Sequence, residues 1–429
     1  MIETTLGFRS LIYRKKQYIS LFLICLFGTA ISLFSLFMSR GMLDSLNEKA
    51  LVYYGGDLVV MSNNHSDRFI PNHKNMIEKL KKIMPSDAVI TERYDFSAET
   101  NVSLYYEGEE VLQRVIKAVD FEKESYLFAK MNMMEGNAAI EAGSNKILLS
   151  APIAKKLGVK CGDSITLYLR TITGYINTVD LEINGIFSDS SVFGMYTTYV
   201  NLDFMRKTYG YDYDFTNRIC IEFPERKGLN DKFIADLQKK MEKEFKMFPL
   251  VDDKKIFYDS EWKLSEDTFA LIPLKANLTD VKILKNAMSA VIMLIIVLLV
   301  LIINAGMGST YRVIVMKRIN EIGIYMAIGM KKTSIIASLL LESLFLLLSG
   351  CSAGLVISFV LCKIFSTVNF SFIPGFSIFL TKGFLNPVIY GSGLFAVLFS
   401  VIFVTLLAVF YSVNKCVNIM PCQAISTNE

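Results

Sequence analysis

The chain has 429 residues, 52% of them hydrophobic and 20% charged, and its formal net charge at pH 7 is +4. Its mean hydropathy of +0.39 is above what a soluble enzyme usually shows. The positive charge lies largely beside apolar segments, so it gives no reason to expect nucleic-acid binding. The two histidines, His65 and His73, are too few for a histidine-based metal cluster.

Four long segments of the chain carry no charged residue. They are Gln17–Ser39, Asn286–Tyr311, Ser343–Cys362 and Gly383–Asn414. Each reaches the ~20 residues that a helix needs to cross a hydrocarbon core about 30 Å thick. We therefore predict four transmembrane helices rather than buried helices of a soluble protein. The first segment is longer than the core of a signal peptide, and no small-residue cleavage site follows it, so we predict an uncleaved anchor.

The segment between the first two predicted spans is long enough to form its own hydrophobic core. Apolar spacing predicts helices at Asn72–Met84 and Asn230–Phe245. The stretch KILLSAPIAKKLGVKCGDSITLYL, Lys146–Leu169, indicates strand, helix, turn and strand, with Ser150 as the helix N-cap. Further strands are predicted at Ala88–Tyr94, Thr100–Tyr106, Val111–Val119, Val179–Phe187, Tyr196–Asn201 and Arg218–Phe223. The segment is thus predicted to fold as an α+β domain.

The second span is predicted to be longer than the membrane is thick. No proline interrupts the chain from Thr279, a suitable N-cap, to beyond Tyr311. A helix of this length measures about 50 Å, so it should protrude as a stalk. An apolar stripe on the stalk would pack either on a second stalk or on the first span, and both alternatives remain open. The stripe consists of Leu278, Val281, Leu284 and Met288.

The distribution of lysine and arginine predicts the orientation. Cations are frequent in the N-terminal tail and in the segment between the second and third spans, which we call the elbow. The loop between the third and fourth spans has only Lys363 and Lys382 at its edges. By the positive-inside rule the tail, the elbow and the C-terminus are cytoplasmic, and the α+β domain lies outside.

The elbow is predicted to be a short helix, a glycine break and the start of the third span. Ile319, Ile322 and Met326 share one helical face, Gly329 is suited to the C′ position, and Thr333 or Ser334 can cap the next helix. Its small residues would let a neighbouring helix or protein surface approach closely. The alternative is an amphipathic helix that lies on anionic lipid.

Several motifs resemble those of the FtsX-like permeases of ABC transporters, which include MacB-type exporters and lipoprotein-releasing permeases. NEIGIYMAIGM followed by LLLES resembles the hallmark of that family, and NIMPCQAIS, with Pro421, Ala424 and Ile425, resembles its closing signature. YYGGDLVV (Tyr53–Val60), ILLSAPIAKKLGVKCGDSITL and LEINGIFSDSSV are similar to segments of its extracytoplasmic domain. The resemblance implies a multi-pass protein of the bacterial cytoplasmic (inner) membrane.

In that family the elbow is a coupling helix that sits in a groove of the ATP-binding subunit. The resemblance therefore implies that the ATPase contact or its close support consists of Glu321, Ile322, Gly323, Ala327 and Gly329. It also implies a structural or coupling role for Arg318 and Glu342. We expect Glu342 at the membrane interface, paired with a nearby basic residue, because an unpaired charge deep in the membrane costs roughly 2.5–3.5 kcal/mol. The alternative is a simply hydrated carboxylate.

The predicted fold class is a membrane protein with four transmembrane helices and a large α+β extracytoplasmic domain between the first and second. The predicted parts are a cytoplasmic tail (1–16), a span (17–39), the extracytoplasmic domain of the MacB-like core type (40–277), a stalk and span (278–311), the coupling helix (312–333), a span (334–363), an outer loop (364–385), a span (386–413) and a cytoplasmic tail (414–429).

The segment GIYMAIGMKKTS does not match a phosphate-binding loop, so ATP and Mg²⁺ are expected on a separate ATPase chain and no cofactor or metal on this one. Further expected partners are a second permease copy or paralogue, membrane lipids, and a lipoprotein or an extracytoplasmic or outer-membrane protein. The predicted function is lipoprotein release or export of an amphiphile or peptide. A regulator of an extracytoplasmic enzyme such as a cell-wall hydrolase is the alternative, and the sequence leaves a disulfide between Cys161 and Cys220 open.

Overall fold

A computed structural model describes residues 15–63, 69–97, 102–113, 115–171, 173–189, 191, 193–195, 197–210, 215–224, 229–260, 268–373 and 375–417. Most of both predicted tails lies outside these residues, including Pro421, Ala424 and Ile425. The chain divides into two compact units. The helical unit consists of Met1–Met42, Lys285–Val368 and Leu385–Glu429, and the sheet unit of Leu43–Leu284 and Asn369–Phe384.

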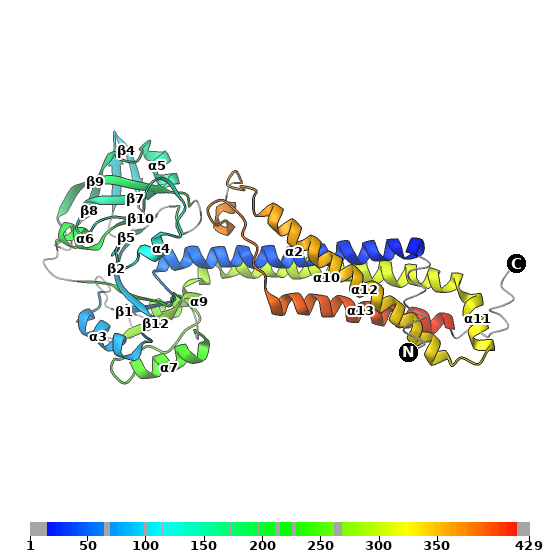
Figure 1. Ribbon diagram of the computed structural model, residues 1–429. Coiled ribbons are helices and arrows are strands. Elements are labelled where there is room, and N and C mark those ends of the chain that lie inside the picture. The colour runs from blue at the N-terminus through cyan, green and yellow to red at the C-terminus, as the bar shows by residue number, and fades with distance from the viewer. Residues whose placement is uncertain are drawn as a thin grey trace. The chain divides into compact units, whose positions relative to one another are not determined.

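The helical unit contains the four apolar helices that the sequence predicts (Figure 1). They are α2 (Lys15–Tyr54), α10 (Thr279–Lys317), α12 (Lys332–Phe365) and α13 (Gly391–Val417). Each is long and apolar enough to cross a membrane. Together with the sheet unit between α2 and α10, they confirm the predicted fold class. Both α2 and α10 are single helices that continue beyond the unit boundary into residues of the sheet unit.

Small residues allow the helices of this unit to pack closely. A Cβ atom at Gly350 of α12 would lie 2.7 Å from Cβ of Cys25, and one at Gly354 would lie 2.7 Å from the carbonyl oxygen of Leu26. On the neighbouring helix, a Cβ atom at Gly28 would lie 2.4 Å from Ile303. In lipid, helices associate largely through such close packing, so these glycines fix α2 against α10 and α12.

The sheet unit is built on one mixed sheet. Among the described residues it has 12 strands, in the order β12-β1-β11-β2-β5-β10-β7-β9-β8-β3-β4, with β6 beside β9. The pairs β5/β10 and β7/β9 are parallel, and the others are antiparallel. The strands are β1 (Leu58–Ser62), β2 (Val89–Ser97), β3 (Ser103–Tyr106), β4 (Glu109–Leu112), β5 (Val115–Val119), β6 (Met133–Gly136), β7 (Lys146–Ser150), β8 (Ser164–Arg170), β9 (Ile176–Phe187), β10 (Thr197–Asn201), β11 (Arg218–Glu222) and β12 (Phe269–Pro273).

Short helices cover the sheet, and figure labels mark most of them (Figure 1). They are α3 (His73–Ile83), α4 (Ser125–Phe128), α5 (Ala151–Leu157), α6 (Leu202–Tyr209), α7 (Asp231–Met241), α8 (Lys254–Ser260) and α9 (Leu274–Asn277). Apolar residues at helical spacing hold α3 and α7 on the sheet, where Met76, Leu80 and Leu237 are buried. The side chain of Asn230 caps α7 by accepting a bond from Phe233 N at 2.8 Å.

Three details differ from the sequence expectations. The predicted strand Val111–Val119 is two strands, because β4 forms a hairpin with β3 whereas β5 lies between β2 and β10. Ser150 precedes α5, but its hydroxyl donates to the carbonyl of Met195 instead of capping the helix. The predicted caps of the third span are also wrong, because α12 begins directly after the extended backbone of Lys331.

The apolar stripe predicted on the stalk is partly buried and partly exposed. Leu278 and Val281 are buried in one cluster with Leu46 and Ala50 of α2. Leu284 is exposed. The first part of the stripe therefore packs within the chain itself.

Candidate functional site

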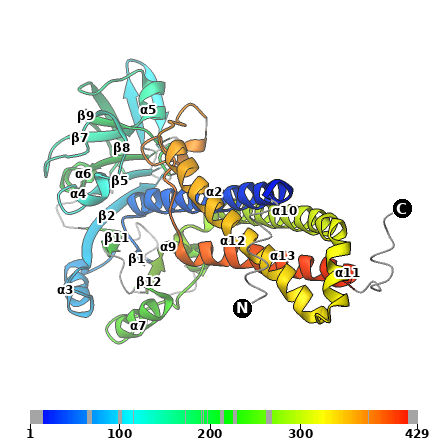
Figure 2. The same ribbon diagram turned by 45° about the vertical axis from the view of Figure 1, so that its right-hand side comes forward.

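The elbow forms a separate short helix, α11 (Ile319–Ala327), at one end of the helical bundle (Figure 2). Only Arg318 separates it from α10, which extends to Lys317. Helix α11 ends as the sequence predicts, with Gly329 in the left-handed region at φ 91°. Gly329 N donates to the carbonyl of Met326 at 3.1 Å, and Met330 N to that of Tyr325 at 3.0 Å. These two bonds form a Schellman motif, which fixes the break between α11 and α12.

The five residues expected at the ATPase contact do not share one environment. Ile322 and Gly323 are buried against the chain's own helices. Glu321 is half-buried, whereas Ala327 and Gly329 are exposed. Of these five, the structure therefore leaves Glu321, Ala327 and Gly329 accessible to another protein.

Two exposed isoleucines of the elbow were not among the residues expected at the ATPase contact. Ile324 is 56% exposed and Ile328 is 75% exposed. They are spaced by four residues and so lie on one helical face. The sequence places Ile328 on the side opposite Ile322, but it does not show that this side remains uncovered. With Ala327 they form the exposed apolar face of α11.

A buried polar cluster connects the elbow to two long helices. Arg318 Nη1 donates to Glu342 Oε2 at 2.9 Å and to Oε1 at 3.1 Å. Tyr18 of α2 also donates to Glu342, and Arg318 Nη1 lies 3.2 Å from the Tyr18 hydroxyl. Arg318 Nε donates to Glu321 Oε2 at 3.2 Å. The expected basic partner of Glu342 is therefore Arg318, and Tyr18 is an additional member.

We name the cluster of Tyr18, Arg318, Glu321 and Glu342 the elbow network. It fixes the junction of α10 and α11. Glu342 is 1% exposed and Arg318 is 8% exposed. A buried charge pair of this kind holds its geometry because breaking it leaves an uncompensated charge. A displacement of α11 would therefore act on both α2 and α12. Sequence reasoning missed Tyr18 because it lies some 300 residues from Arg318 and is unremarkable in an apolar helix.

A second buried cluster, the α2 clamp, holds the other end of α2 in the sheet unit. Arg93 of β2 donates through Nη1 to the carbonyl oxygens of Val52 at 2.8 Å and Tyr53 at 3.2 Å. Its Nε lies 2.9 and 3.0 Å from the two carboxylate oxygens of Glu124, and Nη2 also donates to Glu124. Both side chains are fully buried. A cation at the carbonyl end of a helix is favourable, so Arg93 fixes the last turn of α2 to the sheet.

Further charges surround the clamp. Asp95 Oδ2 lies 2.6 Å from Arg218 Nε and 2.8 Å from Lys117 Nζ, and Lys117 Nζ lies 4.0 Å from the ring centroid of Tyr53 in α2. Burial lowers the pKa of Lys117 to about 8, although Asp95 opposes this change. Burial alone would raise the pKa of Asp95, but Arg218 and Lys117 hold it below its ordinary value. The end of α2 is thus enclosed by buried ion pairs.

The two cysteines of the sheet unit are both free thiols. Cys161 is exposed, whereas Cys220 is buried beside the end of α2, where its thiol lies 3.5 Å from the carbonyl oxygen of Tyr54. Burial raises the pKa of Cys220 to about 12. Cys220 is therefore a packed thiol, and Cys161 is the accessible one of the two.

Comparisons with known proteins agree with the motifs of the elbow. A family model described as FtsX-like permease C-terminal matches residues 291–421. No curated protein matches the chain. One similar solved structure is the crystal structure of the periplasmic region of MacB from Actinobacillus actinomycetemcomitans, at 9% sequence identity and a TM-score of 0.31, covering 54% of this chain and 95% of that one. The family match includes α11, α12 and α13, so the part of the chain that holds the elbow is similar to the C-terminal region of the FtsX-like permeases.

Proposed function

We propose that the chain is the permease subunit of an ABC transporter and that a separate subunit binds and hydrolyses ATP. The observation that supports this most is α11, a short helix between two membrane-spanning helices that carries an exposed apolar face. The elbow network holds its first turn rigidly to α2 and α12. An exposed apolar face on a rigid support is suited to docking another protein.

The proposed mechanism transmits movement along continuous helices. Docking and ATP binding would displace α11, and the elbow network would pass this displacement to α2. Because α2 is one helix from Lys15 to Tyr54, its outer end moves with its inner end. The α2 clamp would then move the sheet, and α10 offers a second uninterrupted path from Lys317 to Thr279. No chemistry is required of this chain.

The finer assignments rest on the resemblance. The expected work is lipoprotein release or export of an amphiphile or peptide, performed by two permeases and two ATPases. An exposed apolar surface on α10, which includes Ile283 and Met293, offers area for a second permease copy or for lipid. The membrane of a bacterial cell is the proposed location, with α11 and both termini in the cytoplasm.

This orientation can be tested with the chain's own thiol. In intact cells a membrane-impermeant maleimide should label Cys161 from outside, and Cys161→Ser should remove that signal, because Cys161 is exposed in the sheet unit. A cysteine introduced as Lys331→Cys in the Cys161→Ser background should become labelled only after the membrane is permeabilised. Labelling of this position in intact cells would contradict the proposed orientation.

The exposed face of α11 should be sensitive to shape rather than to apolar area. Ala327→Leu adds bulk to that face without changing the charge, so it would strengthen attachment to lipid. In a fitted protein groove the same bulk costs about 1–3 kcal/mol, or roughly 5- to 150-fold in affinity. We therefore expect Ala327→Leu to reduce co-purification of the ATP-binding subunit at matched membrane abundance.

The matched control is Ala305→Leu, the same substitution at an exposed position of α10. It should leave recovery of the ATP-binding subunit unchanged. Equal recovery with Ala327→Leu and the wild type would show that α11 is only a membrane-surface helix.

A further inference from the structure

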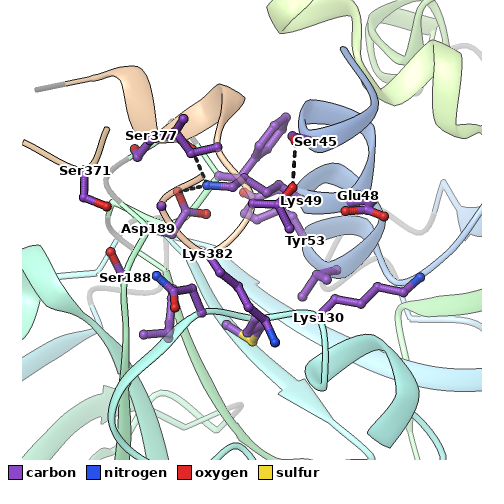
Figure 3. A pocket seen from close by; sticks show the side chains of 18 of the residues that line it. Ser45, Glu48, Lys49, Tyr53, Lys130, Ser188, Asp189, Ser371, Ser377 and Lys382 are labelled. Carbon is purple, nitrogen blue, oxygen red and sulfur yellow. Dashed lines mark hydrogen bonds and ion pairs between the residues drawn. The ribbon is translucent and has the colours of Figure 1, made fainter. Parts of the chain in front are cut away.

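The sheet unit contains a cavity of about 100 Å³, with a mixed polar and apolar lining, that none of the functions above uses. Four segments of the chain line it: the outer end of α2, residues 130–132, described residues between Phe187 and Tyr199, and the loop Ser371–Gly383 between α12 and α13 (Figure 3). This volume has room for several water molecules or for one small polar group. Tyr53, Phe187 and Tyr199 form its apolar wall.

Hydrogen bonds and one ion pair hold the loop against α2. The Ser45 hydroxyl lies 2.7 Å from the Thr381 hydroxyl. Lys49 Nζ donates to the carbonyl of Ser377 at 2.5 Å and lies 3.5 Å from Asp189 Oδ1, as the dashed lines in Figure 3 show. These contacts therefore fix the loop in place as one wall of the cavity.

Lys382 is held at this wall in an unfavourable backbone conformation. It lies with Gly383 in a two-residue turn closed by bonds between Thr381 and Phe384, and both central residues have positive φ, 52° and 85°. Such turns favour glycine, asparagine or aspartate, so a lysine here is strained. Its ammonium group has no ion-pair partner among the residues that the structure describes. The turn thus maintains an unneutralised cation at the cavity.

The charges of the lining favour an anion. Lys49, Lys130 and Lys382 line the cavity beside Glu48 and Asp189. Lys49 is paired with Asp189 at 3.5 Å and Lys130 with Glu222 at 3.8 Å, so among the described residues Lys382 is the lining lysine without an ion-pair partner. Ser188, Ser371 and Asn132 add uncharged hydrogen-bonding groups. The described lining residues include no arginine, whereas bidentate recognition of a carboxylate relies on arginine. Lysine instead binds phosphate as a point charge. We propose that this cavity binds a phosphate group, with Lys382 and Lys49 as its main cationic contacts.

Chain connectivity favours a phospholipid as the source of that phosphate. The loop lies between the end of α12 at Phe365 and the start of α13 at Gly391, and both helices are membrane-spanning candidates. It also carries exposed apolar side chains, with Phe372 76% and Ile373 38% exposed. Such residues are suited to the membrane interface, where lipid phosphates lie. This inference does not depend on the proposed partnership with an ATPase.

The experiment compares lipid retention by variants of the full chain in detergent. Native mass spectrometry would measure the phosphatidylglycerol that remains bound after delipidation and defined re-addition. Lys382→Gln and Lys49→Gln should each weaken retention about tenfold or more, since each removes a charge-assisted bond. Lys239→Gln, at an exposed lysine of α7, is the matched control and should behave as the wild type.

Glu48→Gln gives a test of opposite sign. It removes a negative charge from the lining and should tighten binding of a phosphate, whereas it would weaken binding of a cation. Calorimetric titration of the delipidated chain with inorganic phosphate distinguishes a phospholipid headgroup from free phosphate as the ligand. Binding of phosphate with the same dependence on Lys382, without retained lipid, would identify free phosphate as the ligand. Equal behaviour of all the variants, reversed signs, or no binding of either probe would overturn the proposal.

Discussion

Replacing Arg318 with methionine is expected to lower the free energy of unfolding by about 3–5 kcal/mol. The substitution leaves the carboxylate of Glu342, whose side chain is 2% exposed, without its cation. The Tyr18 hydroxyl still donates to Glu342, but a single neutral donor does not compensate a buried charge. The measurement is unfolding of the purified chain in a titration from mild detergent to dodecyl sulfate. The same change should reduce the amount of chain in the membrane.

A double-mutant cycle separates the ion pair from other effects of Arg318. Arg318→Met combined with Glu342→Met removes both charges and should recover much of the lost stability, because no buried charge remains. Arg312→Met, at an exposed position near the end of α10, is the matched control and should change stability by less than about 0.5 kcal/mol. Additive losses in the double variant would show that the elbow network is not a coupled unit.

Replacing Arg93 with methionine should have an effect of similar size, about 3–5 kcal/mol, in the sheet unit. It leaves Glu124 fully buried without its cation, although Thr91 still donates to that carboxylate at 2.9 Å. It also removes the donor to the carbonyl oxygens of Val52 and Tyr53 at the end of α2. Hydrogen exchange should therefore increase in the last two turns of α2 as well as in β2.

The control for this prediction is Arg170→Met, at the exposed end of β8. Arg93→Met combined with Glu124→Met should recover part of the stability but not the protection of the α2 end, since the carbonyl oxygens remain without their donor. Unchanged hydrogen exchange at Val52 and Tyr53 in the single variant would contradict the clamp.

The sequence was sufficient for features that depend on long local patterns. An uncharged segment of ~20 residues has few alternatives to a membrane-spanning helix, and all four predicted helices are present. The glycine break at Gly329 was also predictable, because a C′ residue in the left-handed region strongly favours glycine. The pattern in Lys146–Leu169 likewise gave β7, α5 and β8.

Features that depend on distant partners could not be predicted. Arg93 and Glu124 lie 31 residues apart, and Tyr18 and Glu342 lie 324 apart, so no spacing rule connects them. Strands β1, β6 and β12 were also missing from the expected elements, because their pairing rather than an alternating pattern makes them strands. All five residues of β1 are buried, so its two faces cannot be told apart by polarity.

The cavity illustrates the same limit. The sequence predicted only an outer loop, 364–385, between the third and fourth spans. It gave no sign that Thr381 would meet Ser45 or that Lys49 would bond to Ser377. Only the fold brings the loop, α2 and residues 187–199 to one site.

The most direct measurement of the central claim is photo-cross-linking from Ile328, the C-cap residue of α11, which is 75% exposed. A photoreactive amino acid at this position, in cells that co-express the candidate ATP-binding subunit, reports whether its neighbour is protein or lipid. The proposed function predicts a cross-link to the ATP-binding subunit from position 328, and none from position 302, an exposed isoleucine in the membrane-spanning part of α10. Cross-links from position 328 to lipid alone would contradict it.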